Sequence, residues 1–246
     1  MSFMVNQLIG FAAADQYFAN AVLFDGTNDY LTRGAELTGN ADGKSGIVSV
    51  WIDPTGGDGV TQYYFFNSGG HFALQKLAAN TINISGYTSA ASLILNLTTT
   101  TTKVAADGWF HLLASWDLAA GFNKMYWNDT DVTAGTTTTD NTIDYTRGDI
   151  AIAADISGGS KNTGNIADFY LNVATSLDIT QTDIRRRFRT AAGKPADLGP
   201  TGAIPTGTAP IIFLSGPTSA WHTNKGTGGG LTLTGTLTDA ATSPSA

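Results

Sequence analysis

Short apolar runs recur along most of the chain and predict an all-β protein. From Ala21 onward these runs alternate with polar residues or are apolar throughout, and Gly, Asn and Asp separate them. Such spacing is typical of strands in a β sandwich. The predicted strands are Val22–Phe24, Asp29–Thr32, Ile47–Asp53, Gln62–Phe66, Phe72–Leu77, Thr81–Ser85, Leu93–Thr98, Phe110–Trp116, Lys124–Trp127, Ile150–Ala154 and Ile166–Val173.

The run from Trp109 to Asp117 shows how the side chains divide between two faces. Phe110, Leu112, Ala114 and Trp116 share one face of this strand, and residues of mixed polarity share the other. We expect the first face to be buried and the second to be mixed. The threonine tracts at 98–102 and 136–139 favour strand ends or edges, because Thr is β-branched.

A single helix is predicted, at Gln181–Ala191. Thr180 can cap it, Ile184 and Phe188 fall on one face, and Gly193 can end it. After Gly193, prolines recur at five-residue intervals with glycines between them, which favours an extended connector that packs poorly on itself.

The chain is therefore divided into an N-terminal arm (1–20), a sandwich (21–191), a Pro/Gly connector (192–210) and a C-terminal β arm (211–246). The last part contains a strand at Ile211–Leu214 and another around Leu231, Leu233 and Leu237. These strands could fold back on the sandwich as an edge hairpin or pair with a neighbouring subunit. The sequence leaves both arrangements open.

Composition and charge narrow the classes of partner. Only 13% of the 246 residues are charged, against about 25% in an average chain, so the surface must consist largely of Thr, Ser, Asn and Gly. The net charge of −7 argues against nucleic acid and anionic membranes. The basic run at Arg185–Arg187 with Arg189 fits either an anion site or a solvated or interface-bound helix face, and we favour the helix face.

Neither cysteine chemistry nor export is indicated. The chain has no cysteine, which excludes disulfides and thiolate sites. The first residues lack the pattern of a signal peptide, and no apolar stretch reaches transmembrane length. The tripeptides that begin at Asn83, Asn96 and Asn128 match the glycosylation acceptor pattern, but carry little weight without a secretory route.

Three segments in order carry a family resemblance. They run from Leu23 to Leu31 (LFDGTNDYL), from Gly108 to Asp117 (GWFHLLASWD) and from Asn165 to Asn172 (NIADFYLN). Over about Ala21–Ala191 this order resembles the laminin-G-like, concanavalin A-like lectin jelly-roll family. The resemblance implies an all-β, two-sheet antiparallel jelly-roll sandwich with extended arms. The third segment departs from the family pattern, because it has an extra residue before Asp168.

Members of this family include glycoside hydrolases that use a pair of nearby carboxylic acids. This chain contains a single glutamate, Glu36, in a polar loop, and its histidines His71, His111 and His222 are scattered. We therefore predict that the protein is not an enzyme.

The resemblance also implies a possible calcium site, since many family members bind one calcium ion. The matching residues are Asp25, Asn28, Asp29 and Asp168. The alternative is that these residues only form a turn and accept backbone hydrogen bonds.

Sugar binding would need aromatic and amide side chains on loops, and Trp221, His222 and Asn224 are the strongest candidates. Tyr63, Tyr64, Tyr87 and Trp127 are also available. Each of these aromatic residues could instead lie in the core or anchor a subunit interface.

The connector and terminal arms resemble arrangements in tailed-phage structural proteins. The leading hypothesis is a bacteriophage virion protein, made in the host cytoplasm, that decorates or cements the capsid. Its partners would be other virion proteins and further copies of itself. The alternative is a carbohydrate-binding adsorption module of a tail or head fibre that binds a host surface glycan, and a glycan-active enzyme is the least favoured hypothesis.

Overall fold

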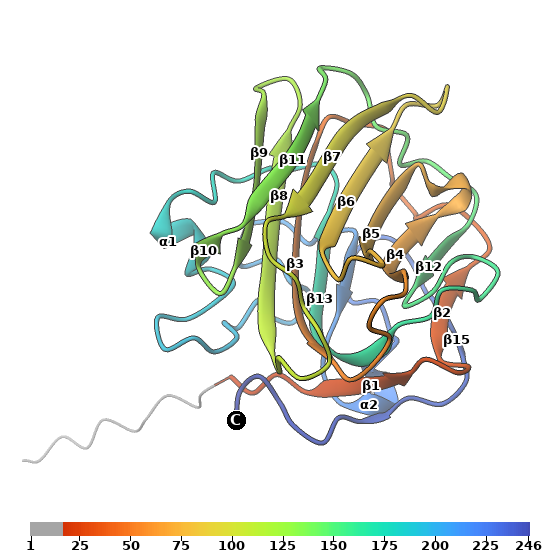
Figure 1. Ribbon diagram of the computed structural model, residues 1–246, viewed down its shortest axis with the longest axis vertical. Coiled ribbons are helices and arrows are strands. Elements are labelled where there is room, and N and C mark those ends of the chain that lie inside the picture. Colours follow the sequence, from red (N-terminus) through yellow and green to blue (C-terminus); the bar gives the residue numbers. More distant parts are fainter. Residues whose placement is uncertain (1–16) are drawn as a thin grey trace, which may run out of the picture.

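Two antiparallel sheets face each other in the computed structural model, which describes residues 17–246 (Figure 1). Sheet A contains, in order, β10 (Thr130–Asp131), β9 (Phe122–Trp127), β8 (Phe110–Asp117), β3 (Ser45–Pro54), β13 (Thr163–Asn172), β1 (Ala21–Asp25) and β16 (Thr238–Asp239), and β14 (Ile212–Leu214) also pairs with β13. Sheet B contains β11 (Thr133–Thr138), β7 (Leu93–Thr99), β6 (Ile82–Tyr87), β5 (Phe72–Lys76), β4 (Gln62–Asn67), β12 (Ile150–Ile152), β2 (Tyr30–Arg33) and β15 (Thr232–Thr234).

This architecture confirms the predicted two-sheet sandwich. Every predicted strand is present, with ends shifted by at most a few residues. A 3-10 turn, Ser68–Gly70, connects β4 to β5. The threonine tract at 136–139 contributes to β11, the edge strand of sheet B.

The main core lies between the two sheets, where alternate side chains of both sheets meet. Phe110, Leu112, Ala114 and Trp116 belong to it, as the alternation in β8 predicts. The Trp116 indole donates a hydrogen bond to the Tyr145 hydroxyl (2.8 Å), which in turn donates to the Ser45 carbonyl. The Trp116 side chain is therefore packed in the core and has its polar atom satisfied.

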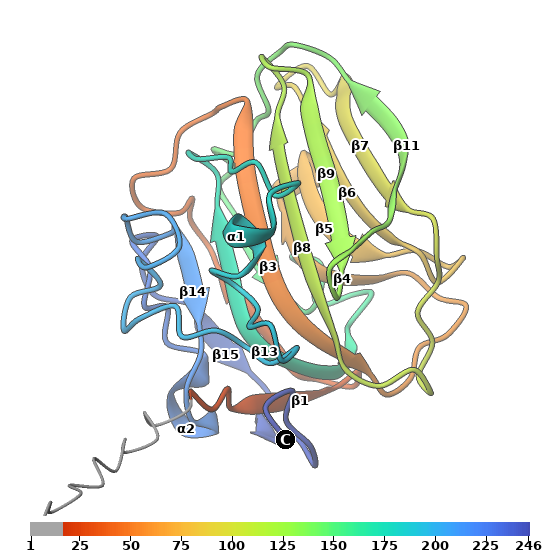
Figure 2. The same ribbon diagram turned by 90° about the vertical axis from the view of Figure 1, so that its left-hand side faces the viewer.

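The outer face of sheet A is buried as well, which differs from the mixed face expected for β8. Ile47, Leu113, Tyr170 and Phe213 on this face pack against Phe188 and other apolar residues of the segment after β13. In Figure 2 this segment lies over sheet A on the side away from sheet B. The mixed polarity of β8 does not mean exposure, because another part of the chain covers that face.

The predicted helix Gln181–Ala191 is too long. Helix α1 spans only Thr182–Arg185, and it begins after Gln181. Beyond it the chain reverses at Gly193 and forms an isolated bridge between Arg189 and Pro195. The extended geometry of this bridge ends the helix, while Phe188 inserts into the apolar cluster over sheet A.

The segment 192–210 also differs from the extended connector that we expected. It forms turns at Gly193, Gly199, Gly202 and Gly207, all with positive φ. Leu198 is buried in the cluster that covers sheet A. The segment thus forms part of the layer that covers the outer face of this sheet.

The C-terminal strands fold back on the same chain, which is one of the two arrangements left open by the sequence. They do not form a hairpin, because β14 and β16 join sheet A whereas β15 joins sheet B. Helix α2 (Thr218–Trp221) lies between them and inserts Trp221 against Phe24.

The N-terminal arm lies mostly outside the described residues. Of its described part, Ala19 is bound by Ser243 and Ser245 of the C-terminal segment. Within residues 17–246, none of the helices has the length and apolarity that crossing a membrane requires.

Gly46 allows the core to close over Trp116, which gives a first test. A Cβ at this position would lie 2.2 Å from the Trp116 ring. We expect Gly46→Ala to lower the free energy of unfolding by about 1–3 kcal/mol, as for other overpacked cores. Urea unfolding measures this change. Gly148→Ala is the control, because nothing lies within 4 Å of its added Cβ, and an equal loss in both variants would contradict the packing account.

Candidate functional site

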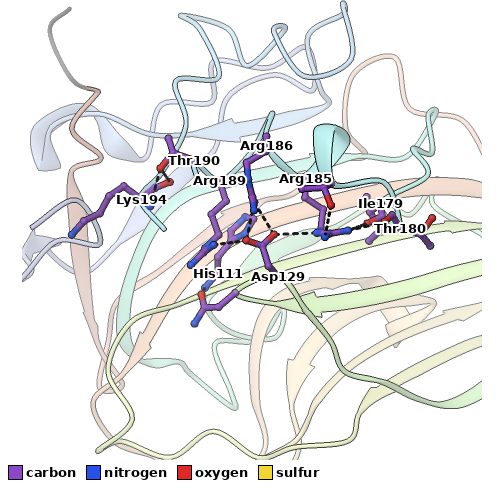
Figure 3. A network of polar contacts seen from close by, with 11 residues as sticks. His111, Asp129, Ile179, Thr180, Arg185, Arg186, Arg189, Thr190 and Lys194 are labelled. Atoms are coloured by element: carbon purple, nitrogen blue, oxygen red, sulfur yellow. Dashed lines mark hydrogen bonds and ion pairs between the residues drawn. The ribbon is translucent and has the colours of Figure 1, made fainter. Parts of the chain in front are cut away.

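Three arginines from the segment after β13 converge on one carboxylate, Asp129 (Figure 3). Arg185 Nε lies 3.0 Å from Asp129 Oδ1, and Arg186 Nη1 lies 2.9 and 2.7 Å from its two oxygens. Arg189 Nη1 binds Oδ2 at 2.5 Å. Asp129 is thereby the anchor of the layer that covers sheet A.

The hairpin between β9 and β10 positions this carboxylate. Its two turn residues, Asn128 and Asp129, both have positive φ, which is the geometry of a type I′ turn and is tolerated by Asn and Asp. Burial favours a raised pKa for Asp129, but the hydrogen bonds from Arg186 and Arg185 outweigh this effect and lower the pKa. Asp129 is therefore ionised at neutral pH.

The basic run is thus not simply a solvated helix face, because Arg185, Arg186 and Arg189 bind Asp129 of the same chain. Arg185 also binds the Ile179 and Thr180 carbonyls, and Arg187 binds the Pro205 carbonyl. These contacts hold the segment 179–205 against the end of the β9–β10 hairpin.

Removing the charge of Asp129 tests this anchoring role. We expect Asp129→Asn to reduce the free energy of unfolding by about 1–3 kcal/mol, because three partly buried guanidinium groups lose their only shared anion. Chemical denaturation at low salt measures the loss. The control is Asp131→Asn, which breaks the surface pair with Lys124 and should cost at most about 1 kcal/mol. Equal losses in the two variants would contradict the account.

His111 lies beside this cluster but does not add to its charge. Its ring is buried, stacks on Trp51 and shares a 2.8 Å hydrogen bond with the Ser49 hydroxyl. Burial, with a smaller effect from Arg189, lowers its pKa to about 3. His111 is therefore neutral at physiological pH and is a satisfied core residue.

The four candidate calcium ligands do not converge. Asp25 pairs with Thr163 at one end of the β1–β13 ladder, whereas Asp168 follows Ala167 at the other end. Five strand positions correspond to about 17 Å. The two oxygens of Asp29 accept backbone hydrogen bonds from Thr236 and Asp25, and one oxygen of Asp25 accepts from Thr27 and Asn28.

These contacts match the alternative that the sequence left open, in which the residues form a turn. Within the described part of the chain, no group of three or more His, Asp or Glu residues could hold a metal ion. We therefore derive no role for calcium from Asp25, Asn28, Asp29 and Asp168.

Asp168 instead holds the start of the described chain. Its carboxylate accepts hydrogen bonds of 2.8 and 2.9 Å from the Tyr17 hydroxyl and is 2% exposed. Burial raises its pKa to about 7, although Tyr17 and Lys225 act in the opposite direction. Its φ is +45°, a conformation that Asp and Asn tolerate better than most residues.

This raised pKa predicts a pH-dependent stability. The folded state holds the Asp168 proton more tightly than the unfolded chain, so stability is lost as the pH rises from about 4 to about 7. A shift of about three units corresponds to roughly 4 kcal/mol. Asp168→Asn removes the titration, so its melting temperature should rise relative to wild type between pH 5 and pH 8. A difference that is constant with pH would contradict this assignment.

The candidate sugar-binding loop is largely structural. Trp221 is fully buried in the main core, and both side-chain atoms of Asn224 bind backbone groups, including Phe213 N and the Ile211 carbonyl. Of the three candidates, only His222 lines a cavity. This cavity has a volume of about 480 Å³ and is also lined by Leu233 and Leu237. Trp221 and Asn224 are therefore not available to a ligand.

The outer face of sheet B is open, in contrast to that of sheet A. No other segment of residues 17–246 lies over it in either view (Figures 1 and 2). Its side chains alternate with core residues and align into rows across the strands, as the strand registers show. One row is Tyr63, Gln75, Asn83, Thr98 and Ala134, and the next is Phe66, Ala73, Ser85, Asn96 and Thr137.

Hydrogen bonds fix the amides of these rows. Gln75 Nε2 donates to Asn83 Oδ1 (3.0 Å), and Asn83 Nδ2 donates to Asn96 Oδ1 (2.7 Å) and Thr98 Oγ1 (3.0 Å). The Asn96 amide nitrogen and Gln75 Oε1 have no hydrogen-bond partner among the described residues. Asn83 is itself buried, and Gln75 and Asn96 are half-buried. The ladder thus orients one free donor, on Asn96, and one free acceptor, on Gln75, on a face that no other described segment covers.

Aromatic and charged groups flank this ladder. The Tyr63 and Phe66 rings on β4 lie 4.5 Å apart and are half-buried. Burial, followed by the nearby Asp155, raises the pKa of Tyr63, so its hydroxyl stays protonated. Near Tyr87, Asp144 Oδ2 lies 3.1 Å from His71 Nδ1 and 2.9 Å from Arg147 Nε.

Another cavity, of about 330 Å³, lies at the end of sheet A where β3 begins and β13 ends. At its rim, Lys44 forms an ion pair with Asp140, and Asp42 accepts hydrogen bonds from Thr146. No aromatic side chain lines it among the described residues.

Sequence reasoning missed the rows on sheet B. Asn83 and Asn96 stood out only as glycosylation acceptor patterns, and Tyr63 only as an available aromatic residue. Polar residues at alternate positions of β5, β6 and β7 were the usable signal, but recognising the rows also requires the registers between strands.

A laminin G family model described as the concanavalin A-like lectin/glucanases superfamily matches residues 25–178, more than half of the chain. No curated protein matches the chain.

A candidate carbohydrate-binding protein from Bacteroides ovatus is similar in structure, with a TM-score of 0.63 and 12% identity over 91% of this chain and 60% of that chain. This chain thus spans less than two thirds of that protein. A heptameric SAP-like pentraxin from Limulus polyphemus has a TM-score of 0.47 and 17% identity, over 66% of this chain and 80% of that chain.

Proposed function

Because the chain belongs to the concanavalin A-like lectin/glucanases superfamily, we propose that it is a non-catalytic carbohydrate-binding module. The observation that carries this proposal is the open outer face of sheet B. On that face the Gln75–Asn83–Asn96 ladder lies beside the Tyr63–Phe66 pair.

The chemistry of this face suits a neutral glycan. Sugar hydroxyls both donate and accept hydrogen bonds, as amides and hydroxyls do, and the apolar face of a sugar ring can pack on an aromatic ring. The ladder holds its amides before a ligand arrives, which lowers the entropy cost of binding. Five strands spaced by about 4.8 Å give a platform of roughly 20 Å, long enough for a short oligosaccharide chain.

The proposed function is binding without catalysis. Glu36 is exposed in the loop after β2, and its backbone carbonyl accepts a hydrogen bond from Arg33. Hydrolysis of a glycosidic bond would require a pair of carboxylic acids at a fixed separation. The rows on sheet B contain amides and hydroxyls instead.

The placement of the module in a virion is a finer proposal, which rests on the resemblance of the sequence to tailed-phage structural proteins. The decoration hypothesis relied on terminal arms that pair with neighbours, but β14, β15 and β16 pair within the chain. We therefore rank the adsorption module of a tail or head fibre, with a host surface glycan as ligand, ahead of the capsid decoration subunit.

A glycan array with the whole chain tests the binding function. We expect binding to neutral oligosaccharides with Kd values in the micromolar to millimolar range. Asn96→Ala and Tyr63→Ala should each weaken the best ligand by about tenfold, since each loses a hydrogen bond or a stacking contact.

Gln181→Ala is the control, because this exposed amide lies beside α1, on the layer that covers sheet A. Its affinity should equal that of wild type. Melting temperatures confirm that the variants are folded. If no glycan binds, or if the Gln181 and Asn96 variants lose affinity equally, the proposed platform is wrong.

A further inference from the structure

The arginine cluster at Asp129 has more hydrogen-bond donors than its acceptors can use. A carboxylate offers about four lone-pair sites, and Asp129 already accepts four hydrogen bonds from Arg185, Arg186 and Arg189. Asp129 is therefore saturated and cannot accept the remaining guanidinium protons.

Arg185 uses all of its nitrogens within the chain. Its Nε binds Asp129, its Nη1 binds the Ile179 and Thr180 carbonyls, and its Nη2 binds Thr182 Oγ1. Arg185 is therefore a structural residue.

Arg186 and Arg189 are different, since each binds Asp129 through Nη1 alone. Their Nε and Nη2 atoms have no acceptor within residues 17–246. Nε and Nη2 form the edge of a guanidinium that binds an oxyanion in a bidentate manner. Arg189 Nε is buried without a partner, and an unsatisfied buried donor is costly.

The charge and the exposure of the cluster also favour binding of an anion. Three guanidinium groups face one carboxylate, and the neutral His111 adds nothing, so the cluster carries excess positive charge in a protein of net charge −7. The side chain of Arg186 is 31% exposed and that of Arg189 is 16% exposed. In Figure 3 Arg186 lies between Arg185 and Arg189, and Arg189 approaches Asp129 on the side of Thr190 and Lys194.

We infer that Arg186 and Arg189 form an oxyanion-binding site that takes a carboxylate or sulfate group. Asp129 holds the two guanidinium groups side by side. The Nε–Nη2 edge of Arg186 and the Nη2 of Arg189 bind the anion, since Arg189 Nε itself is buried. The site lies on the layer that covers sheet A, away from the open face of sheet B, and it does not rest on the proposed platform. An acidic saccharide or a free anion would supply the same chemistry.

Isothermal titration calorimetry of the whole chain at low salt tests the site with methyl β-glucuronide, sodium acetate and sodium sulfate. Methyl β-glucoside is the uncharged control. We expect at least one of the three anions to bind and the glucoside not to bind at this site. Arg186→Gln should weaken anion binding by about tenfold or more, because it removes one charged edge.

Arg187→Gln is the matched control, since it removes the same charge from the neighbouring residue, which binds only the Pro205 carbonyl. Its anion affinity should be unchanged. If Arg186→Gln fails to fold, NMR of the wild-type arginine Nε–H groups replaces it, and the Arg186 and Arg189 signals should shift while that of Arg187 does not.

The outcomes separate the sources of the anion. Tighter binding of the glucuronide than of acetate and sulfate supports an acidic saccharide, and comparable binding of all three supports free oxyanions. No anion binding, or equal losses in the Arg186 and Arg187 variants, would overturn the site. Neither result bears on neutral glycan binding at sheet B, which Arg186→Gln should leave unchanged.

Discussion

Two strands, β1 and β14, pair with successive parts of the same edge of β13, and the arrangement of the sandwich depends on this pairing. Residues 163–167 of β13 pair with β1, and residues 169–171 pair with β14 on the same edge. The register with β3 shifts between Ala167 and Tyr170, where Asp168 adopts a positive φ. This bulge ends one pairing and begins the next, so the C-terminal part of the chain becomes part of sheet A.

That constraint makes the two outer faces unequal. Once β14 is attached to β13, the segment 174–210 must return across sheet A, where Asp129 and the apolar cluster around Phe188 hold it. Sheet B receives only β15 at its edge, so its outer face stays open. The arginine cluster therefore lies in the layer over sheet A, and the amide ladder lies on the opposite side of the molecule, on sheet B.

The sequence predicted the sandwich and its strands well, because alternation along each strand is a local signal. It predicted the arrangement around α1 poorly, because the arginines and Phe188 respond to Asp129 and to the outer face of β8, which are distant in sequence. The candidate metal-binding and sugar-binding residues were also predicted poorly, because their positions depend on contacts that are distant in sequence. Asp25 and Asp168 are separated by the β1–β13 register, and Trp221 fills the core. The rows on sheet B depend on registers between five strands, which composition and periodicity do not determine.

The central claim is that the amide ladder of sheet B binds a neutral glycan. The most direct measurement is an NMR titration of the isotope-labelled chain with the neutral oligosaccharide that binds most tightly on the array, observed at the side-chain amides. The account predicts that the signals of Gln75, Asn83 and Asn96 shift in a saturable manner, while those of Asn172 and Asn224 stay fixed. Shifts confined to Asn172, at the rim of the cavity by β3 and β13, or no saturable shift in the ladder would contradict it.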